Sequence, residues 1–260
     1  MLVFLGKQGI VNKDTTPLPL ALGTGAAKPP VFFSTISGKT MADRTIVYVD
    51  GFNLYYLALR STIYKWLDLY KLAETLLPAE YHDIVKVKFF TARINSLPND
   101  PDAPNRQNIY LKALKAYRPD KIEIVYGKFL SHNARRPYAP PNSGYANVVL
   151  TEEKGTDVNL AVHLLNDAWM NAFDCAVVVS NDSDLAEAMR LAKARNKKIG
   201  WIVPETKHQS QVLKSIPHFI KQLRASALAY SQLPYQIPGT NIIKPQAWDV
   251  GKKTLPSKDK

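Results

Sequence analysis

The stretch that decides the fold is CAVVVSNDSDLAEAMRLAKAR, residues 175–195. Its first five residues are apolar and mostly valine, which favours a short buried β-strand. From residue 184 onward the apolar residues recur at helical spacing, so a helix is expected to follow the strand. Two carboxylates, Asp182 and Asp184, lie where the strand gives way to the helix. They could start the helix or hold a metal ion.

The same alternation of strand and helix patterns recurs along the chain from Thr45 onward. Further strands are expected at 45–49, 83–93, 121–130 and 198–203, and further helices at 53–63, 68–77, 105–117, 156–173 and, as one helix or a pair, 210–223. Strands that alternate with helices indicate parallel pairing. We therefore predict an α/β fold: a three-layer α/β/α sandwich with a central, mainly parallel sheet.

The domain boundaries follow from shifts in composition. Residues 1–42 lack sustained periodicity and are rich in Pro, Gly, Thr and Ala, so we expect a poorly ordered extension. Residues 43–225 are expected to form the domain, and residues 226–260 a basic tail rich in Pro and Lys. Because Met41 lies four residues before the first expected strand, we hypothesise that it is the biological start of the protein.

The formal net charge is +12, but it is unevenly distributed along the chain. Residues 1–40 contribute +3, residues 41–205 only +2, and residues 206–260 contribute +7. A basic C-terminal segment fits a phosphate-binding arm, and it fits an ordinary solubilising tail equally well.

Several classes of protein are disfavoured by composition. No apolar run is long enough to span a membrane, and the start lacks the pattern of a secretory signal. The single cysteine, Cys175, cannot form an intrachain disulfide, and the five histidines make no zinc pattern with it. A cytoplasmic location is therefore expected.

The acidic residues that follow expected strands suggest a metal site. Asp50 follows the strand 45–49, Asp182 and Asp184 follow the strand at 175–180, and Asp157 opens the helix 156–173. In a doubly wound sheet, function gathers outside the carboxyl ends of the strands, so these acids are expected to converge. A hard divalent cation such as Mg²⁺ or Mn²⁺ would offset their mutual repulsion.

Each candidate also has a purely structural explanation. Asp184 with Glu187 resembles a helix-capping pair, Asp157 suits the positive end of a helix, and Asp182 suits a turn. Three further polar residues also have both a functional and a structural explanation. Asn53 could support Asp50 or cap a helix, Ser180 could bond an acid or cap the strand end, and Lys154 could contact a phosphate or be a solvated loop lysine.

Three motifs together resemble those of NYN domains, a group within the PIN-like nuclease superfamily, with the LabA-like branch most similar. They are VDGFNL at 49–54, KGTDVNLAV at 154–162 and VVVSNDSDL at 177–185, and they occur in the order typical of the family. The resemblance covers roughly residues 45–205. Asn181 stands where the family often has Gly, which leaves both neighbouring acids in place.

The resemblance implies a metal-dependent ribonuclease that hydrolyses RNA phosphodiester bonds with Mg²⁺ or Mn²⁺. Carried onto this chain, its catalytic acids are Asp50, Asp157, Asp182 and Asp184. The first three would ligate the ion, and Asp184 would be a further ligand or a support.

The segment 131–148 is the expected contact with RNA. We expect a proline-rich loop here, and it contains Arg135, Arg136, Tyr138 and Tyr145. Arginine suits phosphate and tyrosine suits base stacking, which together fit single-stranded RNA. An ordinary surface loop of this composition remains the alternative.

Two other functions compete with the ribonuclease. A phosphatase of the haloacid-dehalogenase type would need a second Asp two residues after Asp50, where this chain has Phe52. A non-catalytic RNA-binding or adaptor module of the same fold is the stronger rival, and the near-neutral segment 41–205 favours it. The sequence leaves the oligomeric state open, including a homodimer.

Overall fold

The structure is a computed structural model that describes residues 41–96, 100–139, 141–204 and 209–249. The expected N-terminal extension, apart from its last residues, and the end of the expected C-terminal tail lie outside the described residues, so those predictions stay predictions. Residues from Met41 onward belong to one compact unit.

The main sheet consists, among the described residues, of the strands β1 (Asp43–Asp50), β2 (His82–Thr91), β3 (Ile122–Tyr126), β6 (Cys175–Val179), β7 (Lys198–Val203) and β8 (Phe219–Gln222). A separate hairpin is formed by β4 (Lys128–Pro137) and β5 (Tyr145–Lys154). The helices are α1 (Gly51–Leu54), the π-helix η1 (Tyr55–Leu59), α2 (Leu69–Leu76), α3 (Ala103–Tyr117), α4 (Thr156–Trp169), the 3-10 helix η2 (Ser183–Leu185), α5 (Ala186–Ala194), α6 (Gln211–Lys214), α7 (Ala225–Tyr230) and the 3-10 helix η3 (Gln246–Trp248).

The strands of the main sheet lie in the order β3-β2-β1-β6-β7-β8, and each neighbouring pair is parallel. From β1 the chain builds the sheet in one direction, and from β6 it builds it in the other. The direction therefore reverses between β1 and β6, which makes a crevice at the carboxyl ends of these two strands. The prediction of an α/β sandwich with a parallel sheet is confirmed.

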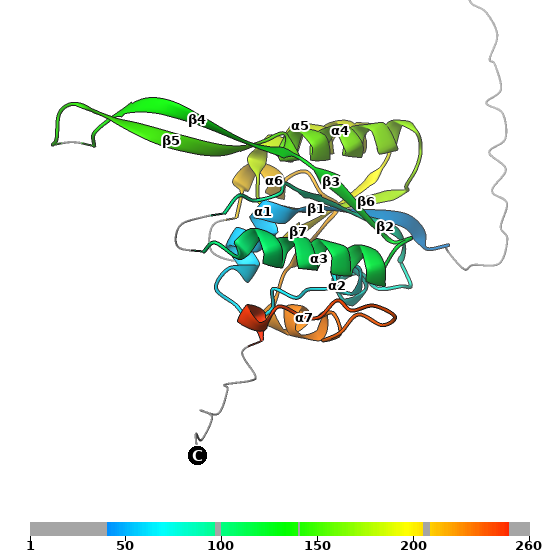
Figure 1. Cartoon of the computed structure of the whole chain (residues 1–260). Helices are drawn as coiled ribbons and strands as arrows, with labels where there is room; N and C mark the ends of the chain where they lie inside the picture. Colours follow the sequence, from blue (N-terminus) through cyan, green and yellow to red (C-terminus); the bar gives the residue numbers. More distant parts are fainter. Residues whose placement is uncertain (1–40, 97–99, 140, 205–208, 250–260) are drawn as a thin grey trace, which may run out of the picture. The chain divides into compact units, whose positions relative to one another are not determined.

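Two hydrophobic cores lie on the two faces of the sheet, because successive side chains of a strand point to opposite faces. In β1, Val47 and Val49 belong to the core under α2, α3 and α7, whereas Ile46 and Tyr48 belong to the core under α4 and α5. Figure 1 shows these two helical layers on either side of the sheet. The three-layer arrangement thus follows from apolar strands that are buried on both faces.

A buried ion pair joins α4 to the sheet. The Asp167 carboxylate lies 2.7 Å from Lys88 Nζ and accepts a hydrogen bond from the Tyr48 hydroxyl at 2.7 Å. The side chains of Lys88 and Asp167 are only 10% and 11% exposed. Burial and the charge of Asp167 raise the pKa of Tyr48 well above its usual range, so this hydroxyl stays a donor.

The expected helix over 210–223 was wrong in its second half. Only the short α6 forms there, and after Pro217 the chain turns into β8, which pairs with β7. The Phe219 ring lies over Gly200 of β7, in space that any larger side chain would occupy. A glycine in the neighbouring strand therefore makes room for an added edge strand.

The strand expected at 121–130 is confirmed over residues 122–126 but does not continue as one strand, and the loop expected at 131–148 was wrong. β3 ends at Tyr126, and the segment up to Lys154 forms the hairpin, paired from Lys128↔Lys154 to Pro137↔Tyr145. Antiparallel pairing satisfies backbone groups that a long loop would leave to water. In Figure 1 the hairpin extends beyond the edge of the sandwich.

The described part of the expected tail packs on the domain. Leu233 and Ile237 are buried, and Trp66 Nε1 donates a hydrogen bond to the Pro234 carbonyl at 2.8 Å. The Trp248 ring contacts those of Trp66 and Tyr110. The apolar residues of this segment thus hold residues 226–249 on the core, even though it lacks regular periodicity. None of the helices that the structure describes is long and apolar enough to cross a bilayer.

Candidate functional site: an acidic pocket at the sheet edge

Asp50 lies at the end of β1 and is only 2% exposed. One carboxylate oxygen accepts a hydrogen bond from the Asn53 backbone N–H at 3.0 Å, and the other accepts one from Ser180 Oγ at 2.8 Å. Burial raises the pKa of Asp50, and the charge of Asp182 adds to this effect, while the two hydrogen bonds oppose it. The carboxylate is therefore held rigidly in a place that disfavours its negative charge.

The turn after Asp50 depends on Gly51. A Cβ atom at this position would lie 2.6 Å from the Phe90 carbonyl oxygen and 2.8 Å from the Phe89 ring. Only glycine therefore lets α1 begin at residue 51, directly after the strand. Asp50 is the N-cap of this helix and accepts the hydrogen bond from the Asn53 N–H.

Asn53 and Ser180 tie the first motif to the third. The Asn53 side-chain oxygen accepts a hydrogen bond from the Asn181 backbone N–H at 2.8 Å. Ser180 Oγ donates to Asp50 and accepts from the Asp182 N–H at 3.1 Å. Ser180 therefore bonds an acid, which is one of the two roles expected for it. Asn53 contacts Asp50 only through its backbone N–H, and its side chain instead joins the ends of β1 and β6.

Asp182 performs the capping that the sequence assigned to Asp184. Its carboxylate accepts a hydrogen bond from the Asp184 N–H at 2.9 Å, and it caps η2. Asp184 is exposed within that turn, and Glu187 pairs with Arg190 rather than capping. The reason is geometric: the 3-10 turn begins at Ser183, so the cap position falls on Asp182, two residues before Asp184.

Asp157 lies in the first turn of α4, after Gly155, whose φ of 92° is left-handed. Its carboxyl group is half-buried and faces several other acids. Burial, followed by the negative charges of Asp50, Asp182, Glu153 and Asp184, raises the pKa of Asp157 to about 6. These couplings indicate that acids from three separate segments converge, as the sequence predicted.

Glu153 is an acid that the sequence reasoning missed. It accepts a hydrogen bond from the Thr156 backbone N–H at 2.9 Å and a second, short one from the Thr156 hydroxyl. Glu153 precedes the N-cap residue Gly155, and the capping box instead places its acid three residues after the cap, so this pattern does not identify Glu153. The neighbouring Lys154 instead pairs with Glu152 at 2.9 Å, and its side chain is 58% exposed.

Four acids line one small pocket of about 260 Å³, which we call the acidic pocket. Its lining residues are Asp50, Phe52, Asn53, Tyr56, Phe129, Glu153, Asp157 and Asp182. Asp184 and Lys154 do not line it. The pocket thus lies between β1 and β6 at the switch point of the sheet, where the topology places a binding crevice.

The donor chemistry of the acidic pocket fits Mg²⁺ or Mn²⁺. Carboxylate oxygens are the ligands that such hard cations prefer, and Mg²⁺ usually keeps several waters while one or two carboxylates bind it. Within the described ranges, no three His, Cys, Asp or Glu side chains lie close enough together to hold an ion directly. An ion here would therefore be held by one or two of Asp50, Asp157 and Asp182 together with water molecules, and Glu153 lies beside them.

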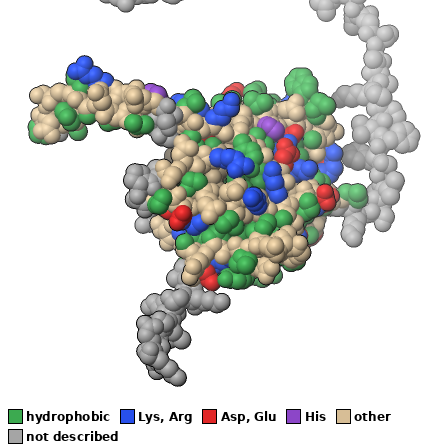
Figure 2. Space-filling model, in the orientation of Figure 1, with side chains coloured by type: hydrophobic (Ala, Val, Ile, Leu, Met, Phe, Trp, Pro, Cys, Tyr) green, Lys and Arg blue, Asp and Glu red, His purple; other side chains and the backbone are tan. Residues whose placement is uncertain are grey.

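The predicted RNA contacts lie on the hairpin and not in the acidic pocket. Arg135 and Arg136 belong to β4, Tyr138 follows it, and the Arg135 guanidinium lies 4.8 Å from the centre of the Tyr145 ring. The base of the hairpin reaches the pocket through Phe129 and Glu153, which are paired across the two strands. Figure 2 shows Lys and Arg side chains on the visible face of the body and near the end of the hairpin.

A second, larger pocket of about 610 Å³ adjoins the first, and we call it the aromatic pocket. The two pockets share Phe52, Tyr56 and Phe129 as lining residues. The sequence reasoning did not identify this pocket, because its walls come from segments far apart in the chain.

Known proteins resemble this chain in two ways. It is 32% identical over 234 residues to 6-hydroxy-3-succinoylpyridine 3-monooxygenase of Pseudomonas putida, a match that covers 79% of this chain and 75% of that protein. The fold also resembles a crystal structure of a protein of unknown function from Vibrio parahaemolyticus, with a TM-score of 0.46, 20% identity, and coverage of 76% of this chain and all of that one.

The family is shown by a match to the NYN domain over residues 44–227. This range contains all three motifs on which the resemblance was based, and it spans the whole acidic pocket. The narrower assignment to the LabA-like branch stays a prediction. The chain therefore belongs to the NYN domain family.

Proposed function

We propose that the protein is a metal-dependent ribonuclease that hydrolyses phosphodiester bonds in RNA at the acidic pocket. The observation that carries this proposal is the convergence of Asp50, Asp157 and Asp182 on one pocket at the switch point of the sheet. NYN domains belong to the PIN-like nuclease superfamily, which supports the same chemistry.

In this proposal the residues of the chain divide the work. A bound Mg²⁺ or Mn²⁺ would supply a water of lowered pKa and positive charge for the phosphate oxygens. Asp50, fixed by Ser180 and by the Asn53 N–H, provides a rigid ligand oxygen. Burial and the neighbouring acids raise the pKa of Asp157, and a bound cation would offset this repulsion and stabilise its carboxylate as a ligand.

The test is cleavage of labelled single-stranded RNA by the purified protein with Mn²⁺ or with EDTA. Asp50→Asn and Asp157→Asn should each lower the rate by at least about a hundredfold, because each removes a charge from the ion site. Asp83→Asn is the matched control, since this exposed acid lies near the amino end of β2, away from the pocket. Cleavage that survives EDTA or both variants would contradict the proposal.

The alternative from the sequence, a non-catalytic RNA-binding or adaptor module, predicts a different result in the same assay. Such a module would bind RNA equally in EDTA and Mn²⁺ and would cleave none of several RNAs.

A second candidate function comes from the Pseudomonas putida relative, whose name describes oxygenation of a pyridine derivative. The aromatic pocket is the observation that favours it, because a small aromatic acid could bind there. The test measures oxygen uptake in the presence of 6-hydroxy-3-succinoylpyridine and reduced nicotinamide adenine dinucleotide. The dinucleotide donates the two electrons that reduce the second oxygen atom to water. Uptake that requires all components would favour this candidate over the ribonuclease.

A further inference from the structure

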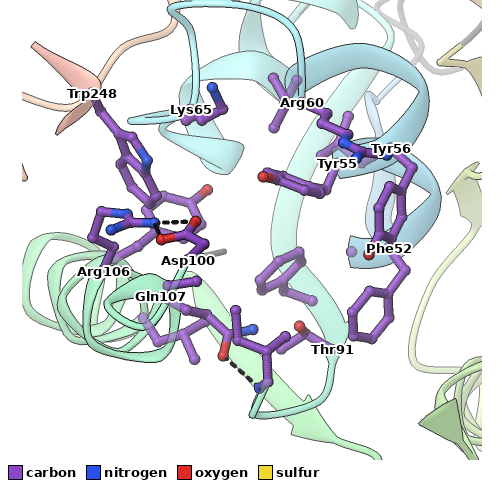
Figure 3. A pocket seen from close by; sticks show the side chains of 18 of the residues that line it. Phe52, Tyr55, Tyr56, Arg60, Lys65, Thr91, Asp100, Arg106, Gln107 and Trp248 are labelled. Carbon is purple, nitrogen blue, oxygen red and sulfur yellow. Dashed lines mark hydrogen bonds and ion pairs between the residues drawn. The ribbon is translucent and has the colours of Figure 1, made fainter. Parts of the chain in front are cut away.

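The walls of the aromatic pocket present flat rings to its interior (Figure 3). The rings of Phe52 and Tyr56 stack with centroids 6.5 Å apart, and Phe129 meets Phe52 edge to face at 5.6 Å. Figure 3 shows Trp248 on the opposite side and the Tyr55 hydroxyl directed into the cavity. Exposed ring faces of this kind stack on a flat aromatic ligand.

A π-helical turn supplies much of this wall. The Arg60 N–H donates to the Tyr55 carbonyl five residues earlier, at 2.7 Å, where the sequence predicted a regular helix over 53–63. The turn carries Tyr55 and Tyr56, which are 38% and 57% exposed. Turns of this type occur frequently at functional sites.

The charges that line the aromatic pocket leave a positive excess. Arg106 pairs with Asp100 through both carboxylate oxygens, so these two charges offset each other. Arg60 lies over the Tyr56 ring at 5.6 Å, and Lys65 donates to the Thr62 carbonyl at 3.0 Å. Among the described residues, neither Arg60 nor Lys65 forms an ion pair. Burial and the nearby charge of Arg106 lower the pKa of Lys65, which marks a place where cations are crowded.

The two adjoining pockets are therefore opposite in charge. Four carboxylates line the acidic pocket, whereas two unpaired cations line the aromatic one, and the rings of Phe52, Tyr56 and Phe129 lie at the border. A ligand that fits the larger pocket needs a flat ring for the rings of the wall and a negative group for Arg60 and Lys65.

We propose that the aromatic pocket binds a flat aromatic ring that carries an anionic group. Two sources share this chemistry: a nucleotide of an RNA strand whose next bond enters the acidic pocket, or a free aromatic acid. The first source rests on the proposed ribonuclease function, and the second does not.

The test is isothermal titration calorimetry in EDTA with two pairs of probes. Uridine monophosphate is compared with uridine, and nicotinate with nicotinamide, so that each pair differs in its negative charge. At least one anion should bind saturably and about tenfold more tightly than its uncharged partner, since a charge-assisted hydrogen bond is lost. Ribose 5-phosphate, which lacks the ring, should bind more weakly than the nucleotide.

Variants of the pocket locate the binding. Arg60→Ala and Lys65→Ala should each lower the affinity for the anion about tenfold. Tyr56→Ala should lower it by a similar factor through lost stacking. The matched controls are Lys112→Ala, an exposed cation on α3, and Tyr81→Ala, a tyrosine with the same 57% exposure near the amino end of β2. Tyr56→Phe removes only the hydroxyl and keeps the ring, so it should keep the affinity. Retained affinity in Tyr56→Phe beside a loss in Tyr56→Ala would assign the loss to the ring.

Each outcome decides between the possibilities. Preference for the nucleotide assigns the pocket to RNA, and preference for nicotinate assigns it to a free acid. Lack of saturable binding by both anions, or equal losses in pocket and control variants, would overturn the proposal. Because binding is measured without metal, absent RNA cleavage beside intact binding would remove the ribonuclease proposal and leave this one standing.

Discussion

At the scale of single residues, the acidic pocket makes a pH-dependent contribution to stability through Asp157. Its pKa is raised to about 6 in the folded protein, whereas an aspartate in an unfolded chain titrates near about 3.9. The folded state therefore binds this proton more tightly, so stability falls as the pH rises from about 4 through about 6. The cost persists at higher pH, where the folded protein must hold the charged form among its acidic neighbours.

Asp157→Asn should therefore raise the free energy of unfolding by about 1 kcal/mol near pH 8 in EDTA and change it little near pH 4. We expect this modest size because the side chain is half-exposed and solvent screens its charge. Urea denaturation at both values, with Asp83→Asn as the control, measures the difference. A gain of the same size at both values would show that the charge of Asp157 is not its cause.

At the scale of elements, the attachment of α4 to the sheet rests on a buried charge. Asp167→Ala would leave the Lys88 ammonium and the Tyr48 hydroxyl buried without this partner, because both contact the same carboxylate oxygen. We expect a loss of about 3–5 kcal/mol in the free energy of unfolding. Chemical denaturation measures it.

The control for that prediction is Glu123→Ala, since Glu123 lies 3.7 Å from the same Lys88 but is 39% exposed. Its loss should cost less than about 1 kcal/mol, as for other exposed pairs. Equal losses in the two variants would indicate that burial of the pair does not set its contribution.

The elements also show which parts of the site could be predicted from sequence. Asp50 and Asp182 were predictable because Asp50 directly follows a short apolar run and Asp182 lies three residues after another, and a parallel sheet brings such ends together. Glu153 was not, because its strand is defined by pairing with β4 and has no strong pattern of its own. The strand β8 was not predicted for a similar reason. Its position depends on Gly200 in β7, and local periodicity does not reveal that contact.

At the scale of the whole molecule, the proposed ribonuclease function requires RNA to bind despite the negative charge at the acidic pocket. The chain has a formal charge of +12, and Arg135 and Arg136 place part of it on the hairpin. Arg135 lies six residues after Phe129 along β4, and Arg136 lies seven residues after it. Six residues of a strand span about 20 Å. That distance corresponds to several nucleotides of an extended strand, so the hairpin would hold RNA at a distance from the bond to be cleaved.

Replacement of Arg135 and Arg136 by alanine should therefore weaken RNA binding and reduce its dependence on salt. If each arginine neutralises one phosphate of a single strand, the slope of log affinity against log salt should fall by about 1.4. Fluorescence anisotropy with labelled RNA in EDTA, at several salt concentrations, measures the slope without cleavage. Lys112→Ala combined with Lys214→Ala removes the same charge from the body of the domain. Equal slopes for the wild type and the hairpin variant, or equal reductions in both variants, would mean that the hairpin is not the arm that holds RNA.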